Sequence, residues 1–189
     1  MDSALIVSST SNSITFFTEM LHAASLSDIS VIPSCGEARR QLFERDFDLV
    51  IVNAPLKDEV GESLARQISA KGQAQVILVV KAECFDQVAA ICEDDGVLTV
   101  AKPIHRTVFW SALSLAKSAQ SRVLKMKAEN QRLKQKIEDI LIVDRAKCLL
   151  ISHLRMSEQD AHRYIEKQAM DIRSTRRAVA EGILKTYDV

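Results

Sequence analysis

The sequence predicts a chain of two parts, a doubly wound, flavodoxin-like α/β domain followed by a helical segment. Three observations support this prediction. Short aliphatic runs alternate with amphipathic stretches over the first 105 residues, the remaining residues have a helical pattern, and the net charge changes sign between the two parts. The 189 residues are enough for one domain or two small ones, which argues against a single large enzyme core.

Five aliphatic runs are expected to form the strands of the α/β domain. The runs are continuous rather than alternating, which is typical of parallel strands covered by helices on both faces. Because a helix follows nearly every strand, the order predicts βαβ units and a flavodoxin-like topology. The predicted strands are residues 4–7, 29–32, 48–53, 76–80 and 97–101, and the predicted helices are residues 12–24, 37–44, 58–70 and 85–93.

The helical segment is expected to contain one long helix followed by shorter ones, since neither Gly nor Pro occurs between Pro103 and Gly182. Ser157 begins a capping box, and Ser174 or Thr175 can cap a last helix. The apolar stripes of the short helices must pack together, which predicts a C-terminal three-helix bundle. The stripes comprise Ala146, Leu149, Leu150 and Leu154, then Ala161, Ile165, Ala169 and Ile172, then Val179, Ala180, Ile183 and Leu184.

The long helix carries apolar residues at alternating spacings of three and four, the a/d pattern of a coiled coil. Asn130 falls at an a position, where a paired asparagine favours a parallel two-stranded interface. The pattern therefore predicts a homodimer, the alternative being a single amphipathic helix packed on its own chain. This dimer seam consists of Val123, Met126, Asn130, Leu133, Ile137 and Ile140, and it breaks at Asp144 and Lys147.

The two parts of the chain carry opposite net charge. Residues 1–105 contain 8 basic and 15 acidic residues, whereas residues 106–189 contain 17 basic and 10 acidic residues. The second part is therefore expected to bind an anionic partner.

Several classes of protein are not expected from this sequence. The longest aliphatic run, Val76 to Val80, is far shorter than the roughly 20 residues of a membrane helix. The acidic Asp2 without a following apolar region argues against a signal peptide, so a cytoplasmic protein is expected. No nucleophile, base and orienting group occur together, so neither an enzyme nor a cofactor is expected. No zinc site or disulfide framework is expected either, because the cysteines are widely spaced, at Cys35, Cys84, Cys92 and Cys148.

Residues 1–118 resemble the CheY-like receiver domains of two-component response regulators. The resemblance rests on the order of elements, on the strand Asp48-Leu-Val-Ile-Val-Asn53 with Pro55 and Gly61 after it, and on Lys102-Pro103 after the fifth strand. It implies a receiver fold. It also implies where a phosphoacceptor pocket would lie.

The pocket residues differ from those of receivers that accept phosphate. Asn53 stands at the position of the nucleophilic aspartate, Ser8 and Ser9 at the acidic magnesium ligands, and Lys81 at a Thr or Ser, so that only Lys102 matches. An aspartyl phosphate needs a carboxylate nucleophile, and the transfer needs a divalent ion held by hard oxygens. A pseudo-receiver without phosphotransfer is therefore expected.

Lys81 and Lys102 are expected to lie near each other at the strand ends. An anion or a partner's carboxylate could occupy that site, or Asp58, Glu59 or Glu83 could neutralise the lysines. The pseudo-receiver would then respond to a regulatory protein or small ligand, or would serve as a constitutive dimer platform.

Residues 137–189 resemble the ANTAR family of RNA-binding transcription antitermination regulators. Four segments carry the resemblance: Arg145-Ala-Lys-Cys-Leu-Leu-Ile151, Met156-Ser-Glu-Gln-Asp-Ala161, Tyr164-Ile-Glu-Lys-Gln-Ala-Met-Asp171 and Val179-Ala180. The resemblance implies an ANTAR bundle. It also implies a target, which is paired stem-loops in a nascent leader transcript.

The residues of this segment suit such a target independently of the family. The helix over residues 158–172 exposes His162, Arg163, Glu166, Lys167 and Met170 opposite its apolar stripe. Cations can bind phosphates, and a tyrosine or histidine ring can stack on unpaired bases. For any single cation the alternative is a solvated helix face, and for the tyrosine it is burial in the bundle. The expected RNA contacts are Lys147, Arg163, Tyr164, Lys167, Arg173, Arg176 and Arg177.

The sequence thus predicts a homodimeric RNA-binding antiterminator with a pseudo-receiver (1–118), a coiled-coil helix (119–141) and an ANTAR domain (142–189). One alternative is a protein-interaction adaptor whose basic helices bind an acidic surface. Another is a phosphorylation-dependent DNA-binding regulator, which Asn53 and the lack of a helix-turn-helix pattern oppose.

Overall fold

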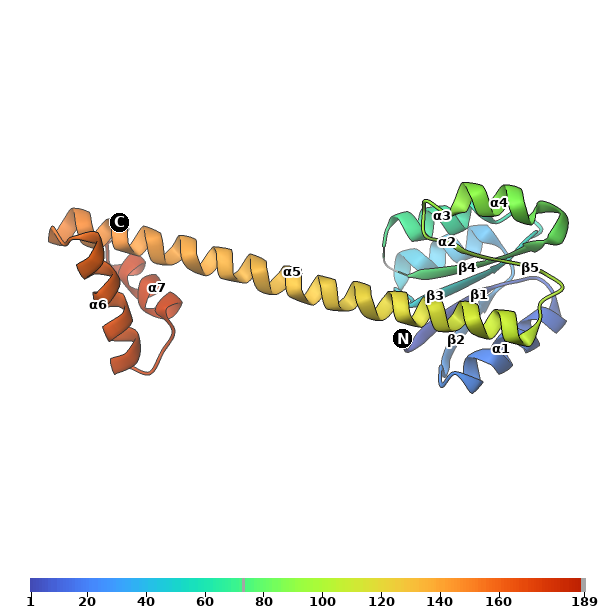
Figure 1. Cartoon of the computed structure of the whole chain (residues 1–189), viewed down its shortest axis with the longest axis horizontal. Coiled ribbons are helices and arrows are strands. Elements are labelled where there is room, and N and C mark those ends of the chain that lie inside the picture. The colour runs from blue at the N-terminus through green and yellow to red at the C-terminus, as the bar shows by residue number, and fades with distance from the viewer. Residues whose placement is uncertain (73, 188–189) are drawn as a thin grey trace. The chain divides into compact units, whose positions relative to one another are not determined.

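The computed structural model describes residues 1–72 and 74–187, and the chain divides into two compact units, Met1–Leu124 and Lys125–Val189. Figure 1 labels their helices and strands. Helix α5 (Arg106–Leu154) contributes its beginning to the first unit and its end to the second. None of the helices among the described residues is long and apolar enough to cross a membrane.

The first unit is built on a five-stranded parallel sheet of order β2-β1-β3-β4-β5, the flavodoxin-like order. The predicted strands agree with the structure within one residue at each end. The strands are β1 (Ser3–Val7), β2 (Asp28–Ile32), β3 (Leu49–Asn53), β4 (Gln75–Lys81) and β5 (Leu98–Lys102). The helices between them are α1 (Ser11–Ala23), α2 (Cys35–Glu44), α3 (Glu62–Ala70) and α4 (Phe85–Cys92), with a short 3-10 turn η1 (Ala82–Cys84) before α4.

Helix α3 begins at Glu62, later than the predicted start at Asp58. The Asp58 carboxylate instead accepts hydrogen bonds from the backbone N–H groups of Cys35 (3.1 Å) and Gly36 (2.9 Å), at the start of α2. Gly61 precedes α3 with a left-handed φ of 97°, which favours glycine. The loop between β3 and α3 is thus longer than predicted because it caps a different helix.

Both faces of the sheet are covered, as the continuous aliphatic runs predict. Figure 1 shows α1 and the beginning of α5 on one face and α2, α3 and α4 on the other. Successive strand residues alternate between the two cores, so that Leu5 packs with α2 to α4 and Ile6 with α1 and α5. The rings of Phe17 and Phe109 join α1 to α5, with centroids 5.2 Å apart.

The second unit contains the predicted three-helix bundle, made by the end of α5, α6 (Glu158–Asp171) and α7 (Arg176–Tyr187). The predicted caps are confirmed, since the Ser157 hydroxyl accepts from the Asp160 N–H and the Thr175 hydroxyl from the Ala178 N–H, each at 3.2 Å. The first helix of the bundle is continuous with the helix of the dimer seam. The buried core consists of Ala146, Leu150, Ala161, Ile165, Ala180 and Ile183.

Two residues of the predicted apolar stripes are exposed to solvent. Leu154 is 45% exposed and Ile172 is 60% exposed, so the prediction was wrong for both. Leu154 is the last residue of α5, and Ile172 follows the last residue of α6. The chain turns at these points, with Arg155 and Arg173 at positive φ, so the helical spacing no longer decides which way the side chain faces.

Candidate functional site

The carboxyl ends of β1 and β3 bring Ser8 and Asn53 together in the first unit. The amide nitrogen of Asn53 donates to the Ser8 hydroxyl oxygen at 2.9 Å, and both residues are almost fully buried. The Thr10 N–H also donates to that oxygen, at 3.3 Å. The Asn53 Oδ1 atom is buried without a hydrogen-bond partner in the described structure, whereas Ser9 is exposed. The Asn53 amide and the Ser8 hydroxyl are uncharged, so neither supplies a carboxylate for phosphoryl transfer.

Lys81 and Lys102 are paired in the register of β4 and β5. The Lys102 ammonium donates to the Ala54 carbonyl at 2.6 Å, which directs it toward the end of β3. Burial lowers the pKa of Lys102, and the charge of Lys81 lowers it further. Two lysines therefore lie near each other at the carboxyl ends of β4 and β5, as predicted.

Two of the three acids that could neutralise these lysines bind elsewhere, and the third, Glu83, is exposed and forms no ion pair with either lysine among the described residues. Asp58 accepts from two N–H groups at the start of α2, and these hydrogen bonds hold its pKa below the ordinary value. Glu59 forms a bidentate pair with Arg39, with 2.8 Å between Nη2 and Oε2. The expectation that Asp58 or Glu59 neutralises the lysines was wrong, because both carboxylates hold α2 in place.

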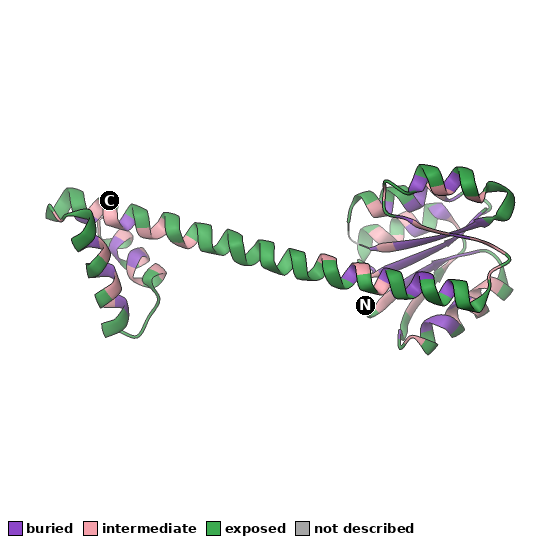
Figure 2. Cartoon of the chain, viewed as in Figure 1, coloured by how far each residue is buried: buried purple, intermediate pink, exposed green. Residues whose placement is uncertain are grey.

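The seam residues of α5 lie on the surface of the single chain. Figure 2 shows the middle of α5 almost entirely in the green of exposed residues. The exposed fractions are 71% for Met126, 49% for Leu133, 58% for Ile137 and 59% for Ile140, while Asn130 is exposed and Val123 is half-buried.

Two of the predicted RNA-contacting cations are held inside the second unit. The Lys147 ammonium lies 2.7 Å from Asp144 and 3.4 Å from Glu158, which links α5 to the start of α6. Arg177 donates to Asp139 and to Glu181, each at 2.8 Å, which links α7 to α5. Hydrogen bonds to these acids raise the pKa of both cations.

The other predicted contacts are more accessible. Arg163, Lys167 and Arg173 are exposed, and no ion pair joins them to an acid within residues 1–72 and 74–187. Tyr164 is 39% exposed, on the same helix as the first two cations. The structure thus separates the predicted residues into an accessible group and a group that holds the helices together.

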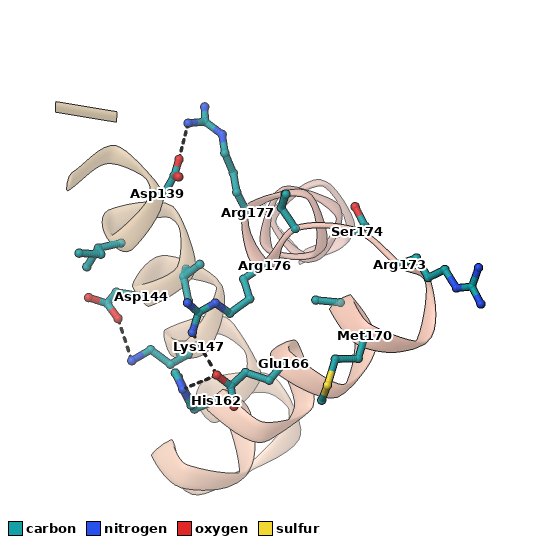
Figure 3. Close-up of a pocket in the computed structure, with 14 residues that line it drawn as sticks. Asp139, Asp144, Lys147, His162, Glu166, Met170, Arg173, Ser174, Arg176 and Arg177 are labelled. Carbon is teal, nitrogen blue, oxygen red and sulfur yellow. Dashed lines mark hydrogen bonds and ion pairs between the residues drawn. The ribbon is translucent and has the colours of Figure 1, made fainter. Parts of the chain in front are cut away.

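The three helices of the second unit enclose an open cleft of about 890 Å³ (Figure 3). Ile140 and Val143 of α5 and Ala169 and Met170 of α6 supply apolar lining. Met170 is 71% exposed, so a large apolar side chain is available at this site. The cleft leaves no sign in the spacing of residues along the chain, because it depends on how the three helices pack.

Polar side chains of α6 and α7 meet in the same cleft. The Glu166 Oε1 atom accepts a hydrogen bond from Arg176 Nη1 at 3.0 Å and lies 3.3 Å from His162 Nε2. Figure 3 shows Glu166 between these two side chains, while Arg173 points away from the cleft. Arg176, predicted to contact RNA, is therefore also an internal partner.

The comparisons with known proteins cover both units. A family model described as the ANTAR domain matches residues 131–184. The transcriptional regulatory protein PdtaR of Mycobacterium tuberculosis (strain ATCC 25618 / H37Rv) is 30% identical over 139 residues, which cover 74% of this chain and 68% of PdtaR. The chain belongs to the ANTAR family. The matched length in PdtaR is longer than the ANTAR domain alone.

The first unit of this ANTAR-family protein has a receiver fold. The receiver domain of an HD domain-containing protein from Pseudomonas fluorescens Pf-5 superimposes with a TM-score of 0.58, at 20% identity over 66% of this chain and 92% of that one. A receiver domain from Clostridium thermocellum gives 0.57, at 17% identity over 65% and 99%. The predicted architecture of receiver fold, long helix and ANTAR helices is confirmed.

For the described residues, no group of three or more His, Cys, Asp or Glu side chains is placed to hold a metal ion. The four cysteines are free thiols, with Cys35 and Cys92 buried and Cys84 and Cys148 exposed.

Proposed function

We propose that this ANTAR-family protein is an RNA-binding transcription antiterminator of the cytoplasm and not an enzyme. It would bind stem-loops in nascent leader transcripts and favour transcription into the genes downstream. One observation carries the proposal: three cations, Arg163, Lys167 and Arg173, are exposed without acidic partners among the described residues. They lie close in sequence to the accessible ring of Tyr164, within the segment that matches the ANTAR model. Such cations neutralise phosphates, and such a ring can stack on an unpaired base.

In this proposal the seven predicted contacts divide into two roles. Arg163, Tyr164, Lys167 and Arg173 contact the RNA directly, and Arg176 lies at the edge of that surface. Lys147 and Arg177 support the surface by holding α6 and α7 against α5. Sequence is read in RNA mainly where bases are unpaired, which favours loops over duplex stems as the target.

We further propose that the seam from Val123 to Ile140 joins two chains. Four apolar side chains of this seam are about half or more exposed in the single chain, and a second copy in parallel register would cover them. Asn130 would pair with its own copy and fix the register. Two linked bundles then bind two adjacent loops, and the second contact benefits from the high effective concentration created by the first. In this division residues 1–118 form the pseudo-receiver, 119–141 the dimerisation helix and 142–189 the RNA-binding domain.

The receiver unit would act without phosphorylation at the usual position. Asn53 offers a neutral amide whose nitrogen is already bonded to Ser8, and Lys102 is bonded to a backbone carbonyl. A partner protein or a small ligand would supply any signal. Incubation with acetyl phosphate and Mg²⁺ should leave the mass of the protein unchanged, and a singly phosphorylated product would overturn this part of the proposal.

RNA binding is tested by gel shift of the full chain with an RNA that carries two tandem stem-loops. Each phosphate neutralised on a single strand contributes about 0.7 to the slope of log affinity against log salt. The double variant Arg163→Gln/Lys167→Gln should lower that slope by about 1 to 2. Lys185→Gln, which removes an exposed lysine of α7 outside the proposed surface, is the matched control.

The same experiment distinguishes the antiterminator from a protein-interaction adaptor. An adaptor would bind an acidic protein surface and would give no shift with tandem stem-loops even at low ionic strength. That result would contradict the proposed function.

A further inference from the structure

Glu166 is an acid on the helix that carries the exposed cations Arg163 and Lys167. A carboxylate repels phosphate, so on a surface that only neutralised the RNA backbone this acid would weaken binding. The carboxylates of Asp139 and Asp144, which also line the cleft, bind the cations that join the helices. Glu166 is likewise bound through one oxygen, to Arg176 of α7, but it is the acid that lies on the same helix as the exposed cations.

One oxygen of Glu166 is occupied and the other is available. Its Oε1 atom is shared by Arg176 Nη1 at 3.0 Å and His162 Nε2 at 3.3 Å, while Oε2 accepts no hydrogen bond within the described part of the bundle. Two neighbours on one oxygen fix the plane of the carboxylate. The side chain is 41% exposed, and it lines the cleft.

The rest of the cleft suits a flat, partly apolar group. Val143, Ala169 and Met170 line it with apolar surface, and its volume of about 890 Å³ exceeds what a single nucleobase needs. Arg173 extends outward from the rim, as Figure 3 shows, where it can pair with a phosphate attached to a group inside. These features complement one nucleotide: the apolar wall suits the face of the base, the oriented acceptor suits its polar edge, and the cation outside suits its phosphate.

We propose that the cleft takes up one unpaired base of the RNA loop and that Glu166 Oε2 accepts a hydrogen bond from the amino group of that base. This inference rests on the proposed function. Guanine, adenine and cytosine each carry an amino group, whereas uracil offers a single imide N–H between two carbonyl oxygens that a carboxylate repels. The cleft therefore selects an amino-bearing base over uracil at one loop position.

The test uses the full chain and a pool of tandem stem-loop RNAs whose loop bases are randomised. The retained RNAs are sequenced. The wild type should enrich amino-bearing bases over uracil at one loop position by about tenfold, the discrimination of one good base contact. Glu166→Gln should abolish or invert that preference, because the glutamine oxygen still accepts from Arg176 while its amide nitrogen now donates into the cleft.

Glu181→Gln is the matched control. It removes a carboxylate that also binds an arginine, with 2.8 Å between Arg177 Nε and Glu181 Oε1, but Glu181 does not line the cleft. This variant should keep the preference of the wild type. A merely structural role of Glu166 would weaken all loops alike and could not invert the preferred base.

The outcomes separate the two proposals. If the wild type retains RNA and Glu166→Gln shows the same base preference, the base-reading role of Glu166 is overturned while the antiterminator proposal stands. Equal loss of preference in Glu166→Gln and Glu181→Gln would likewise overturn it. If the wild type retains no RNA at low salt, both proposals are overturned.

Discussion

Replacing Ile165 by alanine tests how much of the second unit depends on its small core. Ile165 is fully buried among Ala146, Leu150 and Ala161. Truncating a buried isoleucine to alanine costs about 2–5 kcal/mol. A unit of this size has an unfolding free energy of about 3–10 kcal/mol. The substitution should therefore remove a large share of the stability of the bundle.

Hydrogen exchange measured by mass spectrometry on the full chain provides the assay. Peptides from α6 and α7 should exchange at least about 30-fold faster in Ile165→Ala, which corresponds to a loss of about 2 kcal/mol. Peptides from β3 and β4 should exchange at the wild-type rate, because those strands belong to the other compact unit. The change is thus expected in one unit only.

Ile172→Ala is the matched control, since the same atoms are removed from a side chain that is 60% exposed. Surface substitutions of this kind change stability by about 0.5 kcal/mol or less, so exchange should stay within a factor of about two. Equal effects of the two substitutions would refute the assignment of the core. Wild-type exchange in Ile165→Ala would refute it as well.

Three further predictions concern the seam, one internal cation and the thiols. Asn130→Lys should shift the sedimenting species from dimer toward monomer, because an ammonium group cannot be buried against its own copy, and a wild type that is monomeric at every concentration would contradict the proposed seam. Arg177→Gln should speed hydrogen exchange of α7 severalfold and leave the slope of log RNA affinity against log salt unchanged, since the guanidinium is bonded to Asp139, with 2.8 Å between Nη1 and Oδ1. A smaller slope would show that Arg177 contacts the RNA. Iodoacetamide at about pH 8 should label exposed Cys84 well before Cys35, because burial, aided by nearby carboxylates, raises the pKa of Cys35 to about 11 and leaves about one thiol in a thousand ionised. Equal labelling rates would show that Cys35 is not enclosed.

The receiver fold could be predicted from the sequence because each strand is buried on both faces. Such a strand appears in the sequence as a continuous aliphatic run. The start of α3 could not be predicted in the same way. Asp58 looks like the first turn of the following helix, but its carboxylate binds the start of α2, 22 residues earlier at Gly36. A cap made between distant segments leaves no periodic pattern.

The candidate RNA surface could also be predicted only in part, because it too depends on contacts between distant segments. Residue type and helical spacing identify the cations, yet Arg163 and Arg177 cannot be told apart by them. Arg177 has its partner Asp139 in another helix, 38 positions away in the chain. Whether a charge is available depends on such distant partners, and only the packed bundle reveals them.

The loop that follows β3 has a consequence for how the receiver unit can take part in control. Lys102 fastens it to β5 through the Ala54 carbonyl, Asp58 fastens it to the first turn of α2, and Glu59 fastens it to Arg39. Switching requires a segment with two arrangements of similar free energy, and a segment tied to three neighbours strongly favours one. Any partner that binds this edge of the receiver unit would therefore meet one fixed arrangement of the loop.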